Sequence, residues 1–105
     1  MTDALFVLTT LPNSNVAAEL AKTLVGEKLA ACANLIPALR SIYRWQGKVQ
    51  DENEVLVLFK TRRARFEALK ARLLELHPYE VPEVLAVPVE DGHAAYLEWL
   101  AAETG

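Results

Sequence analysis

Short runs of apolar residues alternate along the chain with segments whose apolar residues recur at helical spacing. Residues 5–8, 55–59 and 84–87 are apolar at every position and end at polar residues or proline, which is typical of buried strands. After the first run, Asn13 is suited to cap a helix that carries an apolar face through residues 17–25. The N-terminal part of the chain therefore predicts a strand followed by a helix.

The middle of the chain predicts a long hairpin. Residues 31–44 show no helical stripe and contain Pro37, which bars a regular helix interior, so we expect a strand that bends near this proline. Residues 46–48 form a turn, and the chain returns through a polar patch into the apolar run at 55–59. Each arm is about twice the usual strand length of five or six residues.

A second and a third helix are expected further along. Thr61 is suited to cap a helix that His77 and Pro78 then stop. Its buried face consists of apolar residues three or four positions apart, namely Phe66, Leu69, Leu73 and Leu76. A strand at 84–87 follows, and Asp91 and Gly92 then open a short terminal helix.

This order predicts an α+β fold, a ferredoxin-like βαββαβ sandwich with an extended hairpin between its second and third strands and a C-terminal helix. Right-handed crossovers place both long helices on one face of the sheet, so the other face is uncovered in a single chain. The three apolar runs do not alternate with polar residues, so the uncovered face is apolar as well. Exposing it forgoes about 1.5–3 kcal/mol for each large side chain. We therefore expect an obligate homo-oligomer; the alternative is that the terminal helix alone covers the face.

Composition narrows the class of protein. The chain has 105 residues, of which 52% are apolar and 24% charged, with a net charge of −3. These values predict one ordered domain over residues 1–105. The acidic balance argues against nucleic acid as a partner, and no apolar run approaches the roughly 20 residues that span a bilayer. A single cysteine and the absence of a secretory signal pattern at the N-terminus favour a cytoplasmic location.

Four residues are candidates for chemistry, each with a structural alternative. Cys32 lies between alanines, which favours a buried core residue, with a soft metal ligand as the alternative. His77 ends a helix, where it caps carbonyls or joins a metal site. Lys60 and Glu83 stand near strand ends at a sheet edge, where they contact each other or a ligand, or are simply solvated.

The hairpin carries two further features. Tyr43 and Trp45 are too large and apolar to be exposed without a reason, so we expect them to anchor a subunit interface, or else to form a ligand-stacking surface. Asp51, Glu52 and Glu54 form an acidic patch on the returning arm, which we interpret as a solvated face.

No catalytic device is visible in the sequence. The four glycines are scattered and build no phosphate-binding loop. No nucleophile stands beside a base, and no paired carboxylates have the spacing for general acid–base work. We therefore expect a protein that is not an enzyme.

Several of these residues occur together in a specific order. The segments KLAACANLIPALRSIYRWQGKVQ, EVLVLFKT and HPYEVPEVLAVPVEDGHAAYLEWL closely resemble the CutA family of divalent-cation tolerance proteins, and the similarity extends from Phe6 to Leu100. The residues that carry it are Ala31, Cys32, Tyr43, Trp45, Gly47, Lys60, Thr61, His77, Pro78, Tyr79, Pro82, Glu83, Tyr96, Leu97 and Trp99.

The resemblance implies a ferredoxin-like subunit in a tight homotrimer similar to the PII signalling proteins, with hairpins that pair between subunits. It also implies a link to copper and other divalent metals, but no established reaction. By position, Cys32 and His77 match the family's cysteine and histidine. Thr9 and Leu76 stand where some members have a further cysteine and histidine, so this chain lacks two good metal ligands.

We therefore expect a cytoplasmic, non-enzymatic homotrimer with a metal-response or signalling role. Its ligand, a metal ion or a small molecule, is expected at intersubunit clefts lined by Lys60, His77, Tyr79 and Glu83. Copper or another divalent cation is expected to bind weakly, with Cys32 and His77 as its ligands. The alternative is a trimeric scaffold that binds partners and has no specific ligand.

Overall fold

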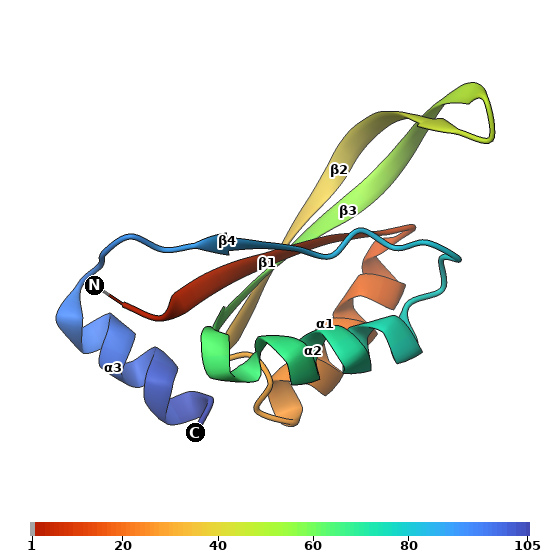
Figure 1. The fold of residues 1–105 in the computed structure, drawn as a ribbon. Coiled ribbons are helices and arrows are strands. Elements are labelled where there is room, and N and C mark those ends of the chain that lie inside the picture. The colour runs from red at the N-terminus through yellow and green to blue at the C-terminus, as the bar shows by residue number, and fades with distance from the viewer. Residues whose placement is uncertain (1) are drawn as a thin grey trace.

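A four-stranded antiparallel sheet is the frame of the computed structural model, which describes residues 2–105 (Figure 1). The elements are β1 (Ala4–Leu11), α1 (Ser14–Gly26), β2 (Cys32–Trp45), β3 (Lys48–Arg62), α2 (Arg63–Leu76), β4 (Leu85–Pro88) and α3 (Ala94–Glu103). Across the sheet the strands run β2-β3-β1-β4, and every neighbouring pair is antiparallel. This order confirms the predicted ferredoxin-like fold.

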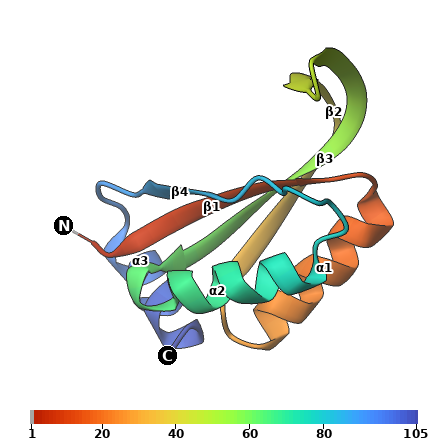
Figure 2. The ribbon, with the colours of Figure 1, turned by 45° about the vertical axis from the view of Figure 1, so that its right-hand side comes forward.

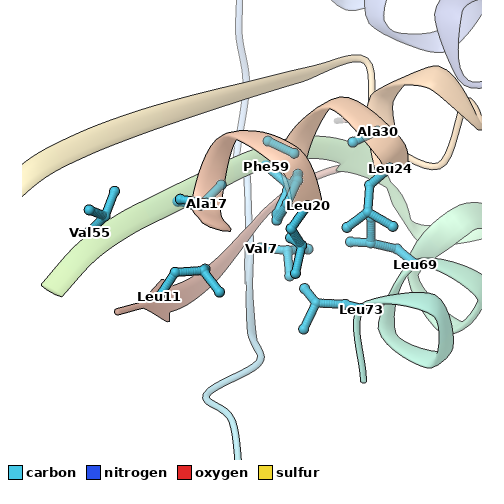
Figure 3. Close-up of a cluster of buried hydrophobic side chains, with 12 residues drawn as sticks. Val7, Leu11, Ala17, Leu20, Leu24, Ala30, Val55, Phe59, Leu69 and Leu73 are labelled. Carbon is cyan, nitrogen blue, oxygen red and sulfur yellow. The ribbon is translucent and has the colours of Figure 1, made fainter. Parts of the chain in front are cut away.

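The core lies between the sheet and the two long helices, which cover the same face (Figures 1 and 2). The Asn13 side chain accepts a hydrogen bond from the Val16 amide at 2.9 Å and so starts α1 as predicted. Fully buried side chains from strands and helices interdigitate in this layer (Figure 3), among them Val7, Leu11, Leu24, Val57, Phe59, Leu69 and Leu73. Their close packing holds both helices against the sheet.

Two predictions at α2 are wrong. Thr61 does not cap the helix, because β3 continues through it to Arg62; its buried hydroxyl donates instead to the Leu29 carbonyl at 2.7 Å. Leu76 is 36% exposed at the end of the helix and does not belong to the buried face. The pairing of β1 with β3 extends to Arg62, and this tertiary pairing overrides the local helix signal.

The hairpin of β2 and β3 has arms of 14 and 15 residues and projects beyond the rest of the sheet (Figures 1 and 2). Its register shifts between Ile36 and Leu39, at the predicted bend, and Ala38 has a φ of 60°. The tip turns at Gly47, whose φ of 78° favours glycine. The fourth strand is displaced by one residue from the prediction, since it runs from Leu85 to Pro88.

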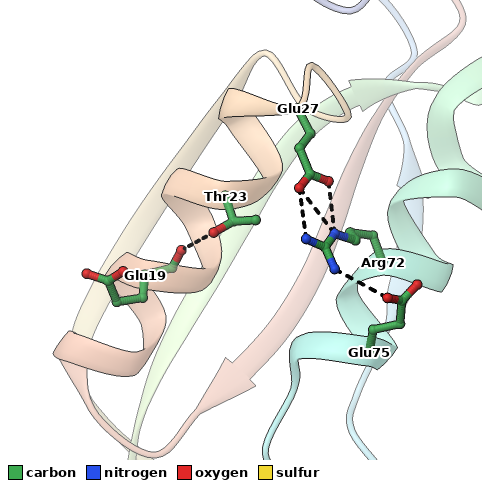
Figure 4. A network of polar contacts seen from close by, with 5 residues as sticks. All are labelled: Glu19, Thr23, Glu27, Arg72 and Glu75. Atoms are coloured by element: carbon green, nitrogen blue, oxygen red, sulfur yellow. Dashed lines mark hydrogen bonds and ion pairs between the residues drawn. The ribbon is translucent and has the colours of Figure 1, made fainter.

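The two long helices are also tied together at their surface (Figure 4). Arg72 on α2 forms a bidentate ion pair with the carboxylate of Glu27, directly after α1, and its Nε and Nη2 each lie 2.9 Å from a carboxylate oxygen. A second ion pair joins Arg72 to Glu75 at 3.3 Å. The Glu27 contact joins residues 45 positions apart. It therefore links the end of α1 to α2 at the surface, where such a contact adds little to the packing of the core beneath.

The face of the sheet opposite α1 and α2 is apolar, as predicted. Residues paired across the sheet share a face, and the row of partners Leu58, Leu8 and Leu85 crosses three strands on this side. Leu85 and Val87 are 57% and 44% exposed. The helix α3 lies at the end of the sheet away from the hairpin and packs by Leu100 on Ala4 (Figure 1). It therefore leaves much of the apolar face open.

None of the helices in the part of the chain that the structure describes has the length and apolar character needed to span a membrane.

Candidate functional site

A cavity of about 680 Å³ lies between the hairpin and the segment that follows α2. We call it the acidic pocket, because four glutamates line it, Glu52, Glu54, Glu80 and Glu83. Its remaining walls come from Thr10 at the end of β1, from Ser41, Ile42, Tyr43 and Trp45 on β2, and from Pro78, Tyr79 and Val81. The end of β1, both arms of the hairpin and the segment after α2 therefore build it.

His77 positions the wall of the pocket that follows α2. The chain leaves the helix here because His77 has extended backbone and Pro78 lacks an amide hydrogen. The ring Nε2 lies 2.8 Å from the Thr10 carbonyl, and Nδ1 accepts a hydrogen bond from the Tyr79 amide at 3.1 Å. The imidazole is thus neutral with its proton on Nε2, and its burial lowers the pKa of His77.

Tyr79 and Glu54 form a buried polar pair inside the pocket. The Tyr79 hydroxyl donates to Glu54 Oε2 at 2.7 Å, and Glu54 is only 6% exposed. Burial, together with this hydrogen bond to a carboxylate, raises the pKa of Tyr79, so its proton stays in place at neutral pH. Among residues 2–105, no Lys, Arg or His side chain forms an ion pair with Glu54. In the described chain, the Tyr79 hydroxyl is therefore the side-chain group that donates a hydrogen bond to Glu54.

The hairpin wall repeats this arrangement at its surface. The Tyr43 hydroxyl donates to Glu52 Oε2 at 3.0 Å, and the hydrogen bond raises the pKa of Tyr43. Trp45 lies on the same wall. In the described part of the chain, no lysine or arginine contributes to the lining. The pocket of this chain therefore combines aromatic rings with several carboxylates, a combination that attracts cations.

Within one chain, the residues predicted to line a cleft between subunits lie in two places. Tyr79 and Glu83 line the acidic pocket, and His77 lies directly behind it. Lys60 of the same chain lies elsewhere, six residues from Glu54 along β3 and roughly 20 Å away, and its place in a cleft between subunits stays a prediction. Its ammonium group is 5.7 Å from the centre of the Tyr96 ring on α3. Lys60 is also on an inner strand of the sheet, not at the edge as predicted.

The two predicted metal ligands are not brought together. Cys32 pairs with Lys60 on the apolar face, whereas the Thr10 carbonyl that holds His77 belongs to a residue paired with Leu56. These positions are four residues apart on β3, roughly 13 Å along the strand. Both nitrogens of His77 are already engaged within the chain. Across residues 2–105, no three His, Cys, Asp or Glu side chains are grouped so that they can hold a metal ion.

The remaining candidate positions are placed as follows. Cys32 is half-buried on the apolar face, with Sγ 4.0 Å from Asn34 Oδ1, so the interpretation as a core residue is wrong. Thr9 is fully buried beneath the helices, where its hydroxyl has no partner among the described residues. Tyr43 and Trp45 are 39% and 38% exposed on the pocket wall, and their role in a subunit interface stays a prediction.

The sequence interpretation missed Glu54, the most buried charge of the pocket. It was assigned with Asp51 and Glu52 to a solvated face, but only Asp51 and Glu52 are exposed. The sequence signal for the burial of Glu54 was its position directly before the apolar run at 55–59. A residue at the start of a buried strand segment lies within the sheet together with that segment.

The sheet order, the overlong hairpin and the terminal helix define an α+β protein of the ferredoxin-like class with an acidic pocket beside its hairpin. The family of CutA1 divalent ion tolerance proteins matches residues 5–103, and the chain belongs to this family. It is 52% identical over 99 residues to the divalent-cation tolerance protein CutA of Thermus thermophilus, covering 94% of this chain and 96% of the relative.

Two further relatives complete the comparison. The chloroplastic protein CutA of Arabidopsis thaliana is 44% identical over 101 residues; the match covers 96% of this chain but 56% of that protein. The chain thus spans little more than half the length of this relative. The solved structure of the Thermus thermophilus protein superimposes with a TM-score of 0.94 at 50% identity, covering 97% of this chain and 99% of that one.

Proposed function

We propose that this protein acts as a homotrimer in the tolerance of divalent cations and binds a positively charged ligand at the acidic pocket. The observation that carries this proposal is the lining of the pocket by four glutamates, including the buried Glu54, without a lysine or arginine among the described residues. The family to which the chain belongs supplies the link to divalent ions.

A divalent cation such as copper is one ligand of this kind, and we propose that it binds weakly. The pocket offers carboxylate oxygens, which suit hard cations better than copper. The soft ligand Cys32 is elsewhere, and within residues 2–105 no preformed group of three ligands exists. The residues present therefore do not fit a high-affinity copper centre, and a metal ion held here keeps water in most of its coordination positions.

The open apolar face supports the assembly of several subunits. Phe6, Leu8 and Leu58 are only half-buried within one chain, and Leu85 is 57% exposed. Covering each large side chain with another subunit contributes about 1.5–3 kcal/mol. The number of subunits is the one that the resemblance to the CutA family implies, and the projecting hairpin provides edges for pairing between subunits.

The second candidate function is a trimeric scaffold that binds partner proteins without a specific ligand. The exposed apolar side chains favour it, because not all of them need be covered by assembly. In either case we propose that the protein acts by binding and not by catalysis. We further propose the cytoplasm as its location; the chloroplastic name of the Arabidopsis relative shows that relatives occupy other compartments.

Calorimetric titration with Cu²⁺ tests the proposal on the assembled protein. Binding is expected in the wild type, weakened at least tenfold in Glu54→Gln and unchanged in the control Glu75→Gln, which removes a carboxylate from the outer surface of α2. Cys32→Ser and His77→Ala test the alternative ligands. Binding that depends on Cys32 and not on Glu54 moves the site to the apolar face. No binding at micromolar copper favours the scaffold.

A further inference from the structure

We infer that the β-bulge at Pro37 and Ala38 determines which side chains of the hairpin meet a second copy of the chain. The bulge turns Tyr43 and Trp45 to the side of the open apolar face and turns the neighbouring arginines to the opposite side. This inference rests on the proposed function in one respect, that copies of the chain assemble on the open apolar face. It goes further by naming the feature of the fold that extends this face along the hairpin.

The bulge consists of one extra residue in β2. The pairing with β3 passes from Ile36 directly to Leu39, whereas their partners on β3 are only two residues apart. Pro37 and Ala38 therefore stand opposite a single residue, Val55. Pro37 has no amide hydrogen to donate to a ladder, and Ala38 has a φ of 60°, outside the range of a regular strand. Both residues are thus suited to a break in the ladder.

The extra residue reverses the alternation of side chains along β2. Before the bulge, Ala33 and Leu35 pack on the core beneath the helices, so the even-numbered residues face the open side. After the bulge, Leu39 pairs with Glu54, which faces the open side because its neighbour Val55 belongs to the core. From here to the tip, the odd-numbered residues of β2 therefore face the open side.

Two contacts show that the hairpin keeps this reversed alternation. The Tyr43 hydroxyl donates to Glu52, which is two residues from Glu54 and shares its side. Arg40 instead pairs with Asp51 on the opposite side, where its Nε and Nη2 donate to the carboxylate at 2.8 and 2.7 Å. A strand without the bulge would place Arg40 opposite Glu52 and turn the arginines to the open side.

The result is one continuous surface from the sheet to the tip of the hairpin. Ile36, Tyr43, Trp45 and Leu85 are exposed on it, and the hairpin bends away from the side on which α1 and α2 lie (Figures 1 and 2). Aromatic side chains are frequent anchors of protein interfaces. A second copy is the partner that this surface fits, because it continues the apolar face that we propose for assembly.

Two variants that both remove the bulge separate its effect on the facing of side chains from its effect on the bend. Deletion of Pro37 removes the extra residue, so Tyr43 and Trp45 stay on the open side. Insertion of an alanine between Glu54 and Val55, made together with Pro37→Ala, gives the extra residue a partner instead. Regular alternation then turns both rings to the opposite side. Light scattering should find three times 11.7 kDa for the wild type and the deletion variant, and 11.7 kDa for the insertion variant.

Two point variants cover the case that the insertion variant does not fold, which circular dichroism reveals. Trp45→Ala truncates a ring on the open side, and Ile42→Ala truncates a side chain on the opposite side that is 66% exposed. Trp45→Ala should raise the subunit concentration at which half of the assembly dissociates at least tenfold. Ile42→Ala should leave this concentration unchanged.

A folded insertion variant that keeps the mass of the wild type overturns the inference. So does a deletion variant that loses this mass, because the bend and not the facing of side chains then controls assembly. Equal effects of Trp45→Ala and Ile42→Ala overturn it as well. A wild type of 11.7 kDa removes the proposed homotrimer together with the inference, whereas a trimeric wild type with an equally trimeric insertion variant removes the inference alone.

Discussion

Thr9 and Thr61 are both fully buried on the helix-covered face of the sheet, but only one of them uses its hydroxyl. The Thr9 hydroxyl has no hydrogen-bond partner among residues 2–105, whereas the Thr61 hydroxyl donates to the Leu29 carbonyl at 2.7 Å. Valine has the shape of threonine with a methyl group in place of the hydroxyl. The substitutions Thr9→Val and Thr61→Val therefore make the same change in two buried sites and should have opposite effects.

The expected sizes follow from these contacts. A buried hydroxyl without a partner costs about 1–3 kcal/mol, so Thr9→Val should raise the free energy of unfolding by roughly 1–2 kcal/mol after some loss to repacking. Thr61→Val removes a hydrogen bond and leaves the Leu29 carbonyl without this donor, so it should lower the free energy of unfolding by about 1–3 kcal/mol.

Urea denaturation of the wild type and both variants measures the difference. All samples need the same subunit concentration, since the stability of an oligomer depends on it. Equal m-values show that the midpoints report stability alone. A Thr9→Val protein that is less stable than the wild type refutes the reasoning, because the hydroxyl then contributes to stability. Thr61→Val with an unchanged midpoint refutes the value assigned to its hydrogen bond.

Three further predictions concern assembly, pH and the C-terminus. Leu58→Glu places a charge in the middle of the open apolar face and should reduce the mass found by light scattering from three times 11.7 kDa to 11.7 kDa. The control Leu74→Glu, at an exposed position of α2, should leave the mass unchanged. A folded Leu58→Glu trimer contradicts the proposed assembly. Burial lowers the pKa of His77 in the folded protein, so on acidification the imidazole of the unfolded chain takes up a proton first. The free energy of unfolding should therefore fall as the pH drops below about 6.5. A His77→Gln protein with the same pH dependence contradicts this assignment. Thr104→Val should lower the free energy of unfolding by about 1.5–3 kcal/mol, because Arg62 Nε, 2.9 Å from the Thr104 hydroxyl, loses its acceptor; an unchanged urea midpoint contradicts this.

The placement of the predicted site residues within one chain depends on the strand register. Lys60 and Tyr79 were predicted to line one cleft between subunits, which stays a prediction; within one chain they lie apart, because Lys60 is far along β3 beside α3. Cys32 was interpreted as a core residue because its neighbours are alanines, yet the strand register turns its side chain to the open face. Strand register determines which side chains share a face, and it depends on pairing between segments distant in sequence.

The sequence by itself determined the order of the elements, the ferredoxin-like class and the apolar character of both faces of the sheet. These properties depend on the spacing of neighbouring residues, which is visible in any stretch of chain. Only the tertiary structure decided how the pocket is composed. Its two decisive contacts join Tyr79 to Glu54, 25 residues away, and His77 to Thr10, 67 residues away. The residues that form such contacts show no periodic pattern in the sequence. They come together only when the hairpin and the segment after α2 pack on the same sheet.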